Sequence, residues 1–534
     1  MTPTQKHLLK LLLEIDDICK KHNIEYFLEY GTILGGVRHE GFIPWDNDLD
    51  ISMTEDNYDK FVEACRTELD HKTRTFCDNR INREFPTVFG HYVDLESCRM
   101  SNRTTFWDNL CGQCIDIFCL IELPGEAEAK QKAIDRFFAY DEYCNTSFMH
   151  YHMKTDEVFN LYRQYQEREK EIGRENVLKE LEAEIFGHHY EDCDTYLAGS
   201  ARVGNPGALN PKKVYDHYKE VQFEGHVFHV PGDYVESLTL YYGDNFHLFP
   251  KDLRIHTEMS HTGVPCRAYV DDFMRLLDKD EMLRERKTFK DLGIEEGHRL
   301  TKIKQKFYQA LGLKVNWSLQ QKIKKENLDV KALVAGGTPE DLDKLDKLFT
   351  EYFNKQLHSD VLYWRVHFDI GDDLEYAAMY TLLMKRNNRR GIDLLFRLRG
   401  QNNLPLTEDM KHMRDTVQHI RNIKKYMMYG EYQKTKENLD WCLEHFSESK
   451  EIRLWDMRYQ VEMAETEADC RKCEALINEM LSRYPQDDYC RKAQGDILWK
   501  LGDKDKAREI YAQLKETTND GLILLDIRKK EEFA

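Results

Sequence analysis

The chain has 534 residues, enough for two to four domains, and 77 Lys and Arg against 96 Asp and Glu give a net charge of −19. This acidity excludes general nucleic-acid binding, because a phosphate backbone requires a basic protein face, although it permits a nucleotide held through a metal ion. Hydrophobic residues make up 41% of the chain, which is enough for packed cores and excludes a disordered protein.

The sequence carries no apolar run long enough to cross a bilayer, and its N-terminus lacks the pattern of a signal peptide. Its 14 cysteines are scattered, without the arrangement of a small-domain disulfide framework. We therefore expect a cytoplasmic protein with reduced thiols. Cys111 and Cys114 have the spacing of a metal knuckle, but buried free thiols are the favoured interpretation.

In chain order, the first predicted element is an amphipathic helix that ends near residues 22–23. Its apolar stripe consists of Leu8, Leu11, Leu12, Ile15 and Ile18. A short strand at 24–28 precedes a glycine-containing turn at 31–36, and the last part of 46–53 alternates like a second strand, with Asp48 and Asp50 on one face. Thr54 is the expected N-cap of the next helix.

A strongly apolar strand is predicted at 114–121, followed by a mostly helical insertion at about 126–195. Two short strands follow at 221–223 and 227–230. These patterns predict an α+β domain over 1–260. Aromatic residues of the insertion, such as Phe137, Phe138 and Tyr143, are expected to form helix core, with an aromatic cage for a quaternary ammonium group as the alternative.

Helical periodicity dominates the rest of the chain, which we divide into a helical connector at 261–340 and an all-α region at 341–534. Three residue triplets in this region recur 34 and 38 residues apart, a period that is typical of tetratricopeptide helix pairs. The triplets are Thr435/Leu439/Cys442, Cys473/Ile477/Met480 and Ala507/Tyr511/Leu514. An irregular helical bundle is the alternative. Such repeats would offer a surface for a protein partner.

The chemistry is expected at Asp48 and Asp50. On a strand, an Asp-x-Asp pair places two carboxylates on one face with Cα atoms roughly 6–7 Å apart, which suits a hard divalent cation. A third acid, Asp116, interrupts an apolar strand, where an unpaired charge is costly. Upstream, Gly31 and Thr32 belong to a turn whose N–H groups can hold a phosphate. Together these residues predict a phosphoryl-transfer site with Mg²⁺ or Mn²⁺ bound by the three acids.

Residues 31–51 read Gly-Thr-Ile-Leu-Gly-Gly-Val-Arg-His-Glu-Gly-Phe-Ile-Pro-Trp-Asp-Asn-Asp-Leu-Asp-Ile. This segment resembles the signature of the LicD-type phosphotransferase family, which includes bacterial phosphocholine transferases and the fukutin-related ribitol-phosphate transferases. The family's usual form has Asp at the position of Asn47. Residues 115–118 are similar to the family's later strand with the third acid, and segments between 230 and 256 resemble its closing part. The resemblance covers roughly residues 5–260.

The resemblance implies a nucleotidyltransferase fold with a mixed sheet. It also implies that a CDP-linked donor gives a substituted phosphate to a hydroxyl of a glycan or lipid-linked saccharide, as in lipopolysaccharide synthesis. Asp48 and Asp50 would bind the metal, and Asp116 would complete the site or act as base. The residues expected to contact the donor are Gly31, Thr32, Arg38, His39 and His256. For the two histidines a structural role is an equal alternative.

Two other functions fit the pattern less well. A glycosyltransferase also uses Asp-x-Asp to hold a nucleotide-sugar diphosphate, but it would need a doubly wound α/β domain before the acids. A scaffold with an inactive front domain is disfavoured because all three acids are present. The basic run Lys385–Arg390 is expected to be a solvated helix end, although it would also suit an anionic glycan or membrane surface. The protein would then be peripheral to the inner membrane face.

Overall fold

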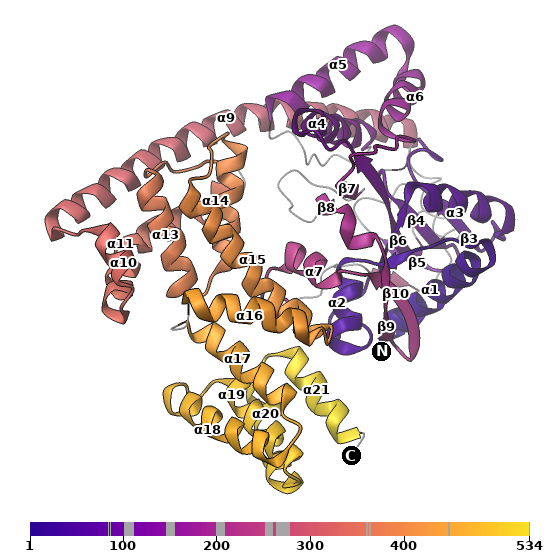
Figure 1. Ribbon diagram of the computed structural model, residues 1–534. Coiled ribbons are helices and arrows are strands. Elements are labelled where there is room, and N and C mark those ends of the chain that lie inside the picture. Colours follow the sequence, from indigo (N-terminus) through magenta and orange to yellow (C-terminus); the bar gives the residue numbers. More distant parts are fainter. Residues whose placement is uncertain are drawn as a thin grey trace. The chain divides into compact units, whose positions relative to one another are not determined.

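The computed structural model of the chain is shown in Figure 1. It describes residues 1–83, 85, 87–100, 112–145, 155–198, 209–250, 260–262, 278–358, 361–362, 365–446 and 449–532. The chain forms two compact units. The first comprises residues 1–242 and 250–301, and the second comprises residues 243–249 and 302–534.

The first unit is built on a seven-stranded mixed sheet with the order β1-β2-β6-β4-β3, and β7 and β8 extend it beside the C-terminal part of β6. β2 and β6 are parallel, and the other neighbours are antiparallel. The strands of the sheet are β1 (Phe27–Leu28), β2 (Asp50–Thr54), β3 (Arg74–Cys77), β4 (Gly90–Asp94), β6 (Gln113–Leu123), β7 (Thr195–Ala198) and β8 (Leu209–Pro211). Two further antiparallel pairs are β9 (Tyr218–Phe223) with β10 (His226–Pro231), and β5 (Cys98–Met100) with β11 (Ser260–Thr262).

The helices of this unit precede, cover and interrupt the sheet. They are α1 (Pro3–His22), α2 (Tyr30–His39), α3 (Glu55–Glu68), α4 (Ala127–Cys144), α5 (Asp156–Ile172), α6 (Arg174–Ile185), the 3-10 helix η2 (Lys212–Tyr215) and α7 (Tyr234–Tyr242). The long helix α9 (Lys279–Glu326) continues into the second unit. The predicted helical insertion is thus confirmed as α4, α5 and α6. Phe137, Phe138 and Tyr143 are buried in it, which favours helix core over an aromatic cage.

One face of the sheet is covered by α1 and α3. Ile51, Ile115 and Ile117 on this face are fully buried. Tyr92 of β4 donates its hydroxyl to Glu14 of α1 at 3.2 Å, and its ring lies 6.4 Å from that of Phe61 on α3. Because side chains alternate along a strand, the neighbouring residues Asp50, Asp116 and His91 point to the opposite face.

The second unit is all-helical, as the sequence predicts. Its helices, besides the end of α9, are α10 (Val330–Gly336), α11 (Pro339–Gln356), α13 (Asp372–Met384), α14 (Arg389–Gln401), α15 (Glu408–Met428), α16 (Tyr432–Phe446), α17 (Lys450–Met463), α18 (Glu467–Arg483), α19 (Asp488–Lys500), α20 (Lys504–Thr517) and α21 (Gly521–Glu532). The fold class is therefore confirmed: an α+β region with a mixed sheet, then an all-α region. Among the described residues, no helix combines the length and apolar character needed to cross a bilayer.

The predicted repeat triplets occupy equivalent places in alternate helices. All nine residues are buried, and they lie on α16, α18 and α20. Gly495 of α19 packs against Tyr511 of α20 so closely that a Cβ at Gly495 would lie 2.5 Å from the Tyr511 ring. This is the small-to-large packing of stacked helix pairs, and assignment of the region to the tetratricopeptide class stays a prediction.

Ion pairs hold the short segment 243–249 to the helices of the second unit. Arg421 of α15 donates through Nε and Nη2 to the two carboxylate oxygens of Asp244, both at 2.9 Å. Arg389 of α14 lies 3.1 Å from the same carboxylate.

In the basic run at 385–390, Lys385 and Arg386 each form an ion pair of 2.5 Å with an aspartate of α11. The run therefore serves the packing of the helical unit.

Candidate active site

Three polar residues form a row across adjacent strands. Asp50 of β2 and Asp116 of β6 are Cα partners, and Asp116 is in turn the partner of His91 on β4. Since partners on neighbouring strands point to the same face, all three side chains lie on the side of the sheet opposite α1 and α3. The parallel β2–β6 pairing thus brings together two acids that are 66 positions apart in the sequence.

Asp46 and Asp48 approach this row from the segment before β2. The predicted strand is wrong at its start, because it included Asp48 and β2 begins at Asp50. The physical reason is a turn: the Asp46 N–H donates to the Ile43 carbonyl at 2.9 Å, and the Asp46 carboxylate accepts the Asn47 N–H at 3.1 Å. Asp48 therefore reaches the site from a loop and not from the face of a strand.

The carboxylates of these acids repel one another at a site that is partly shielded from solvent. Burial, then the carboxylates of Asp48 and Asp116, raises the pKa of Asp50 well above its usual range, with smaller contributions from Asp46 and Glu29. Burial and the neighbouring Asp48 raise the pKa of Asp46 to about 8. Clustered carboxylates of this kind bind a hard cation favourably, because the cation removes the repulsion and accepts oxygen ligands.

The glycine-containing segment is a helix and not the predicted turn. Gly31 and Thr32 lie in the first turn of α2, and the N–H groups of Thr32 and Ile33 donate to the Glu29 carbonyl. Thr32 also accepts the N–H of Asp50 on its hydroxyl oxygen at 2.9 Å, which fixes the helix start to the start of β2. The helix N-terminus thus lies beside the acids.

The absence of a side chain at Gly31 matters for this contact. A Cβ there would lie 3.0 Å from the Asp46 carboxylate and 3.7 Å from the Tyr242 hydroxyl. The preceding residue, Tyr30, has a φ of 46°, a left-handed conformation that non-glycine residues rarely adopt. Strained backbone of this type is common at functional sites, where the surrounding structure maintains it.

Aromatic residues border the acids. The Tyr30 ring lies 5.0 Å from Phe118 of β6 and 4.4 Å from Tyr241 of α7. Tyr242 follows on α7; its side chain is partly exposed, but desolvation of the hydroxyl together with the charges of Asp50 and Asp46 raises the pKa of that group. The Tyr242 hydroxyl therefore stays protonated and can donate a hydrogen bond within the site.

A fifth acid, Glu29, lies beneath the cluster and escaped the sequence analysis. Its side chain is buried, and one carboxylate oxygen accepts hydrogen bonds from Ser52 at 2.6 Å and Tyr215 at 3.1 Å. Burial raises its pKa to about 7 despite these bonds. Its backbone N–H donates to the Asp50 carbonyl at 2.9 Å, so Glu29 holds the loop that carries α2 against β2.

Arg38 and His39 lie together at the C-terminal end of α2, about two helical turns from Gly31. Arg38 is buried; its Nε donates to His39 at 3.0 Å, and its guanidinium lies 5.9 Å from the centroid of the Trp45 ring. The structure does not bring these two residues to the N-terminus of α2. His256 and Cys111 lie outside the described residues.

His91 is the second residue that the sequence analysis missed. Its Nε2 lies 3.2 Å from Oδ1 of Asp116, and Cys114 Sγ lies 3.8 Å from the same oxygen. Ligand atoms of all three residues fall within 4.8 Å of one another. The imidazole stacks against Phe89 at 5.1 Å, which fixes its plane. Only a predicted strand at 90–94 would have placed His91 beside Asp116, and the sequence analysis predicted no strand there.

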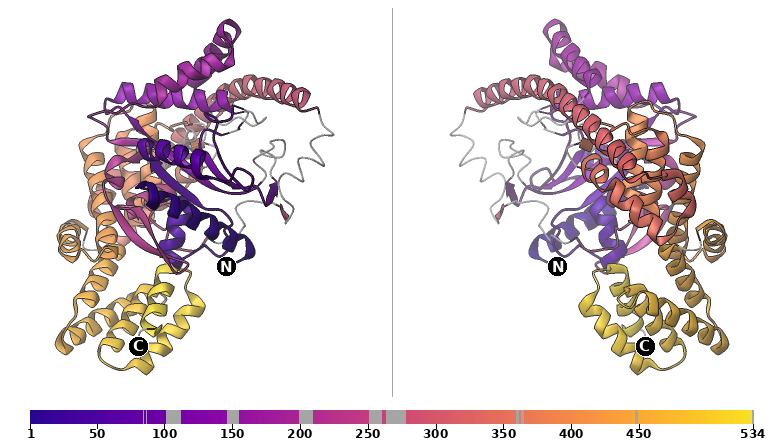
Figure 2. Two further views of the ribbon diagram at one scale, coloured as in Figure 1. Left: turned by 90° about the vertical axis from the view of Figure 1, so that its right-hand side faces the viewer. Right: turned by 90° about the vertical axis from the view of Figure 1, so that its left-hand side faces the viewer.

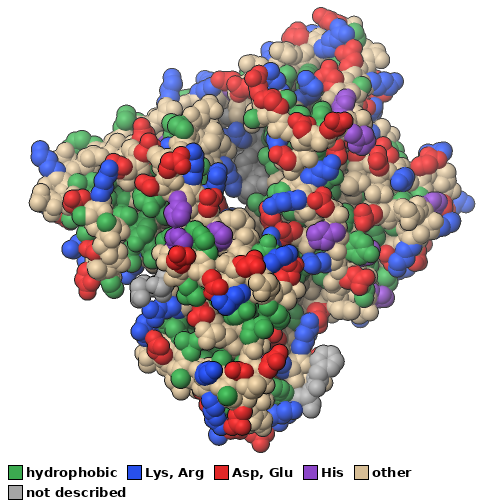
Figure 3. Space-filling model, viewed as in Figure 1, with side chains coloured by type: hydrophobic (Ala, Val, Ile, Leu, Met, Phe, Trp, Pro, Cys, Tyr) green, Lys and Arg blue, Asp and Glu red, His purple; other side chains and the backbone are tan. Residues whose placement is uncertain are grey.

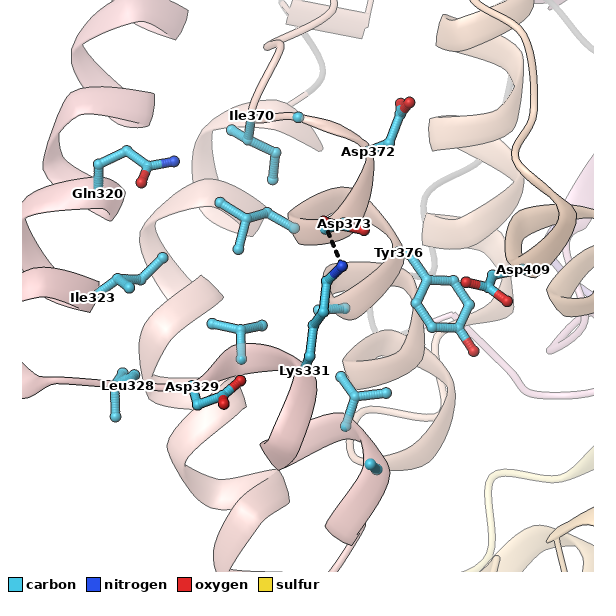
Figure 4. Close-up of a pocket in the computed structure, with 16 residues that line it drawn as sticks. Gln320, Ile323, Leu328, Asp329, Lys331, Ile370, Asp372, Asp373, Tyr376 and Asp409 are labelled. Atoms are coloured by element: carbon cyan, nitrogen blue, oxygen red, sulfur yellow. Dashed lines mark ion pairs between the residues drawn. The ribbon is translucent and has the colours of Figure 1, made fainter.

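The second unit contains a cavity of about 750 Å³ lined by α9, α10 and α13 (Figure 4). Its charged residues have structural partners: Lys331 forms an ion pair with Asp373 at 2.9 Å, and Asp329 accepts the Ala332 N–H at the start of α10. On the face shown in Figure 3, acidic and basic side chains intermingle. The acid cluster of the first unit is therefore the candidate active site.

The chain is similar to known proteins in its first part. Residues 23–111 match the family model of the LicD/FKTN/FKRP nucleotidyltransferase domain. The lipopolysaccharide cholinephosphotransferase LicD of Haemophilus influenzae is 26% identical over 264 residues, which are 46% of this chain and 90% of that protein. Uncharacterized proteins of Rickettsia prowazekii and Rickettsia typhi are each 44% identical over 50 residues, 9% of this chain and 19% and 16% of theirs. Residues 23–111 therefore carry a domain of the LicD/FKTN/FKRP nucleotidyltransferase type, and the chain is similar to a known transferase over most of that protein's length.

Proposed function

We propose that the first unit transfers a substituted phosphate, such as phosphocholine or a polyol phosphate, from a CDP-linked donor to a hydroxyl of a glycan or lipopolysaccharide precursor. The observation that carries the proposal is the row of Asp50 and Asp116 beside the N-terminus of α2. The Haemophilus relative, a lipopolysaccharide cholinephosphotransferase, supports the choice of transferred group and acceptor class.

The donor set fits a hard divalent cation. Asp48, Asp50 and Asp116 supply carboxylate oxygens, and burial together with the repulsion among these oxygens raises the pKa of Asp50. Mg²⁺ or Mn²⁺ prefers such ligands, and when bound it would neutralise charge on the donor phosphates. Because the carboxylates are half-buried, this neutralisation is worth more than it would be in water.

The residues of the chain then have separate tasks. The N-terminus of α2, where Gly31 lies close to the Asp46 carboxylate and the Tyr242 hydroxyl, receives the donor phosphates, and Tyr242 donates a hydrogen bond near them. The acceptor oxygen forms a bond to the substituted phosphorus, the bond to the bridging oxygen breaks, and CMP leaves with its electron pair. Asp116 receives the proton of the acceptor hydroxyl, and His91 holds the Asp116 carboxylate in place.

A thermal-shift panel with CDP, UDP, GDP and ADP derivatives, each with and without Mg²⁺, tests the proposal. A ligand that binds only the folded state stabilises it by about 2.7 kcal/mol at a hundredfold excess over Kd. We expect a Mg²⁺-dependent shift with cytidine nucleotides that is lost in Asp48→Asn. Asp17→Asn, which removes an exposed charge of α1, should keep it.

Two other outcomes would replace the proposal. A preference for UDP-sugars would indicate a glycosyltransferase. No shift with any nucleotide would indicate a scaffold. Release of CMP from CDP-choline or CDP-ribitol in the presence of a saccharide acceptor, measured in the same protein, then distinguishes transfer from binding alone.

A further inference from the structure

Helix α9 exposes an unusual number of apolar side chains. Of the 13 large hydrophobic residues that are exposed in the described part of the chain, seven lie on this one helix. They are Phe289, Leu292, Leu300, Ile303, Phe307, Leu313 and Trp317. Figures 1 and 2 show α9 as one continuous helix. Isolated exposed hydrophobic residues are normal, but a concentration on one element indicates a binding surface.

Within the second unit, these residues form a face that is separate from the core. Ile303, Phe307 and Trp317 are 57%, 60% and 66% exposed, and their spacing of four and ten residues places them on one side of a helix. Val315 and Leu319 of the same helix are buried in the core of the helical unit. One side of α9 therefore packs inward, while a second apolar side faces solvent.

The part of α9 that carries Ile303, Phe307 and Trp317 has charges of one sign, although Glu351 of α11 accepts a hydrogen bond from Ser318 at 3.2 Å. Residues 297–325 contain eight Lys and Arg and no Asp or Glu, although the chain as a whole has a net charge of −19. The eight are Arg299, Lys302, Lys304, Lys306, Lys314, Lys322, Lys324 and Lys325. Lys306 and Lys314 are exposed and lie close to Phe307 and Trp317 in sequence. The surface combines apolar residues with positive charge.

We propose that this face of α9 binds the surface of an anionic lipid bilayer. The apolar side chains would enter the boundary between headgroups and acyl chains, and the lysines would contact lipid phosphates while their alkyl stems cover apolar surface. Trp317 has the amphipathic ring that is typical of this depth. The helix lies along the membrane and does not cross it, in agreement with the absence of a spanning helix among the described residues.

The positive charge of α9 favours a lipid bilayer over two other binding partners, a second copy of this chain and a nucleic acid. A second copy of the same face would bring eight like charges opposite eight more, which is unfavourable. A nucleic acid would use the lysines but leave the apolar residues exposed to water. An anionic bilayer satisfies both features. The inference rests on α9 alone and holds whether or not the first unit transfers phosphate.

Flotation of the full chain with lipid vesicles tests the proposal. We expect binding to vesicles of about three parts phosphatidylcholine to one part phosphatidylglycerol, weaker binding to phosphatidylcholine alone, and weakening by salt. The double variant Lys306→Gln/Lys314→Gln should bind the anionic vesicles on the order of tenfold more weakly. Lys344→Gln/Lys472→Gln, which removes two exposed charges from other helices, should bind like the wild type.

The apolar residues need their own variant. Phe307→Ser/Trp317→Ser should reduce binding to both kinds of vesicle by on the order of tenfold or more, because two apolar side chains are lost from the interface. Val227→Ser/Met463→Ser removes two exposed apolar residues elsewhere and should change nothing. All four substituted positions are exposed, and unchanged circular dichroism would confirm that each variant folds.

Several results would overturn the proposal. One is that the wild type does not bind anionic vesicles, and another is that Phe307→Ser/Trp317→Ser binds them equally well. A dimer in sedimentation that this variant abolishes, without vesicle binding, would assign the face to a second copy. As a direct readout, lipids brominated in their acyl chains should quench wild-type tryptophan fluorescence more than that of Trp317→Phe.

Discussion

His91 on β4 and Asp116 on β6 are Cα partners in the sheet, and Nε2 of His91 lies 3.2 Å from Oδ1 of Asp116. A histidine in this position restricts the directions in which the carboxylate can offer its oxygens. Groups that orient a metal-binding carboxylate typically change metal affinity or activity 10–100-fold when removed. His91 is therefore a positioning residue in the proposed site.

His91→Gln should weaken the apparent affinity for Mg²⁺ by about 10–100-fold in the transferase reaction, with a smaller effect on the KM for the donor. The measurement is the rate as a function of Mg²⁺ concentration. His71→Gln changes an exposed histidine after α3 and should leave the Mg²⁺ dependence unchanged. If His91→Gln lowers the unfolding temperature but leaves the Mg²⁺ dependence unchanged, His91 has only a structural role.

Asp50→Asn should stabilise the metal-free protein while removing its response to Mg²⁺. Burial and the neighbouring carboxylates hold the pKa of Asp50 well above its usual range, so a neutral amide relieves both the desolvation of a charge and the repulsion in the folded state. A gain on the order of 1 kcal/mol would raise the unfolding temperature of a unit of this size by about 2–4 °C. Calorimetry in chelator measures the effect, and Asp17→Asn is the control. If Asp50→Asn is less stable than the wild type, other groups of the folded protein must offset the charge of the Asp50 carboxylate.

The pH dependence of stability should report the buried Glu29. Its pKa is raised from 4.5 to about 7, so below pH 4.5 both folded and unfolded states are protonated and Glu29 has no effect. As the pH rises from about 4.5 to 7, the unfolded state ionises first, and the free energy of unfolding should fall by about 2–3 kcal/mol. Above pH 7 the contribution levels off. Asp46 shifts the profile in the same direction.

Glu29→Gln should remove this part of the fall, because the amide oxygen still accepts the bonds from Ser52 and Tyr215 and carries no charge. Denaturant unfolding at several pH values measures the difference. Glu157→Gln, an exposed position in α5, should show the wild-type profile. If the free energy of unfolding of Glu29→Gln depends on pH as it does in the wild type, Glu29 is ionised in the folded state at neutral pH.

Local pattern was enough to predict the strand that carries Asp116, since β6 is a long apolar run. The residue types alone singled out Asp48 and Asp50 as the acids expected to act with Asp116. Local pattern was not enough to place Asp50 opposite Asp116, because that depends on the register of a parallel pair whose strands are far apart in sequence. The same holds for His91, whose short strand β4 has little apolar pattern of its own, and for Glu29, which is buried by residues from β2 and η2.

Helix α2 shows a different limit. Three glycines in ten residues disfavour a helix by local propensity, so a turn was predicted. Tertiary packing overrides that preference: a Cβ at Gly35 would lie 2.5 Å from the Gly41 carbonyl oxygen, and one at Gly36 would lie 3.0 Å from Val221. The glycines are there for close approach of neighbouring segments and not for chain reversal.

The repeat packing of the helical unit can be tested at Gly495. Gly495→Ala places a Cβ 2.5 Å from the ring of Tyr511, whose hydroxyl is held by Asp496 at 2.7 Å, so the ring cannot move away freely. Overpacking of this kind costs about 1–3 kcal/mol. Gly400→Ala is the matched control, because Gly400 also lies in a helix but has open space around it, and alanine there should be neutral or stabilise by up to about 1 kcal/mol.

Hydrogen exchange shows where in the helical unit the destabilisation by Gly495→Ala occurs, in addition to how large it is. In Gly495→Ala the amides of α19 and α20 should exchange faster than in the wild type, while those of the first unit keep their rates, because the disturbed contact lies between these two helices. In a stack of helix pairs each pair contacts mainly its neighbours, so α18 and α21 should be the next most affected. Faster exchange spread evenly over all helices from α10 to α21 would instead indicate one cooperative bundle and would contradict the repeat assignment.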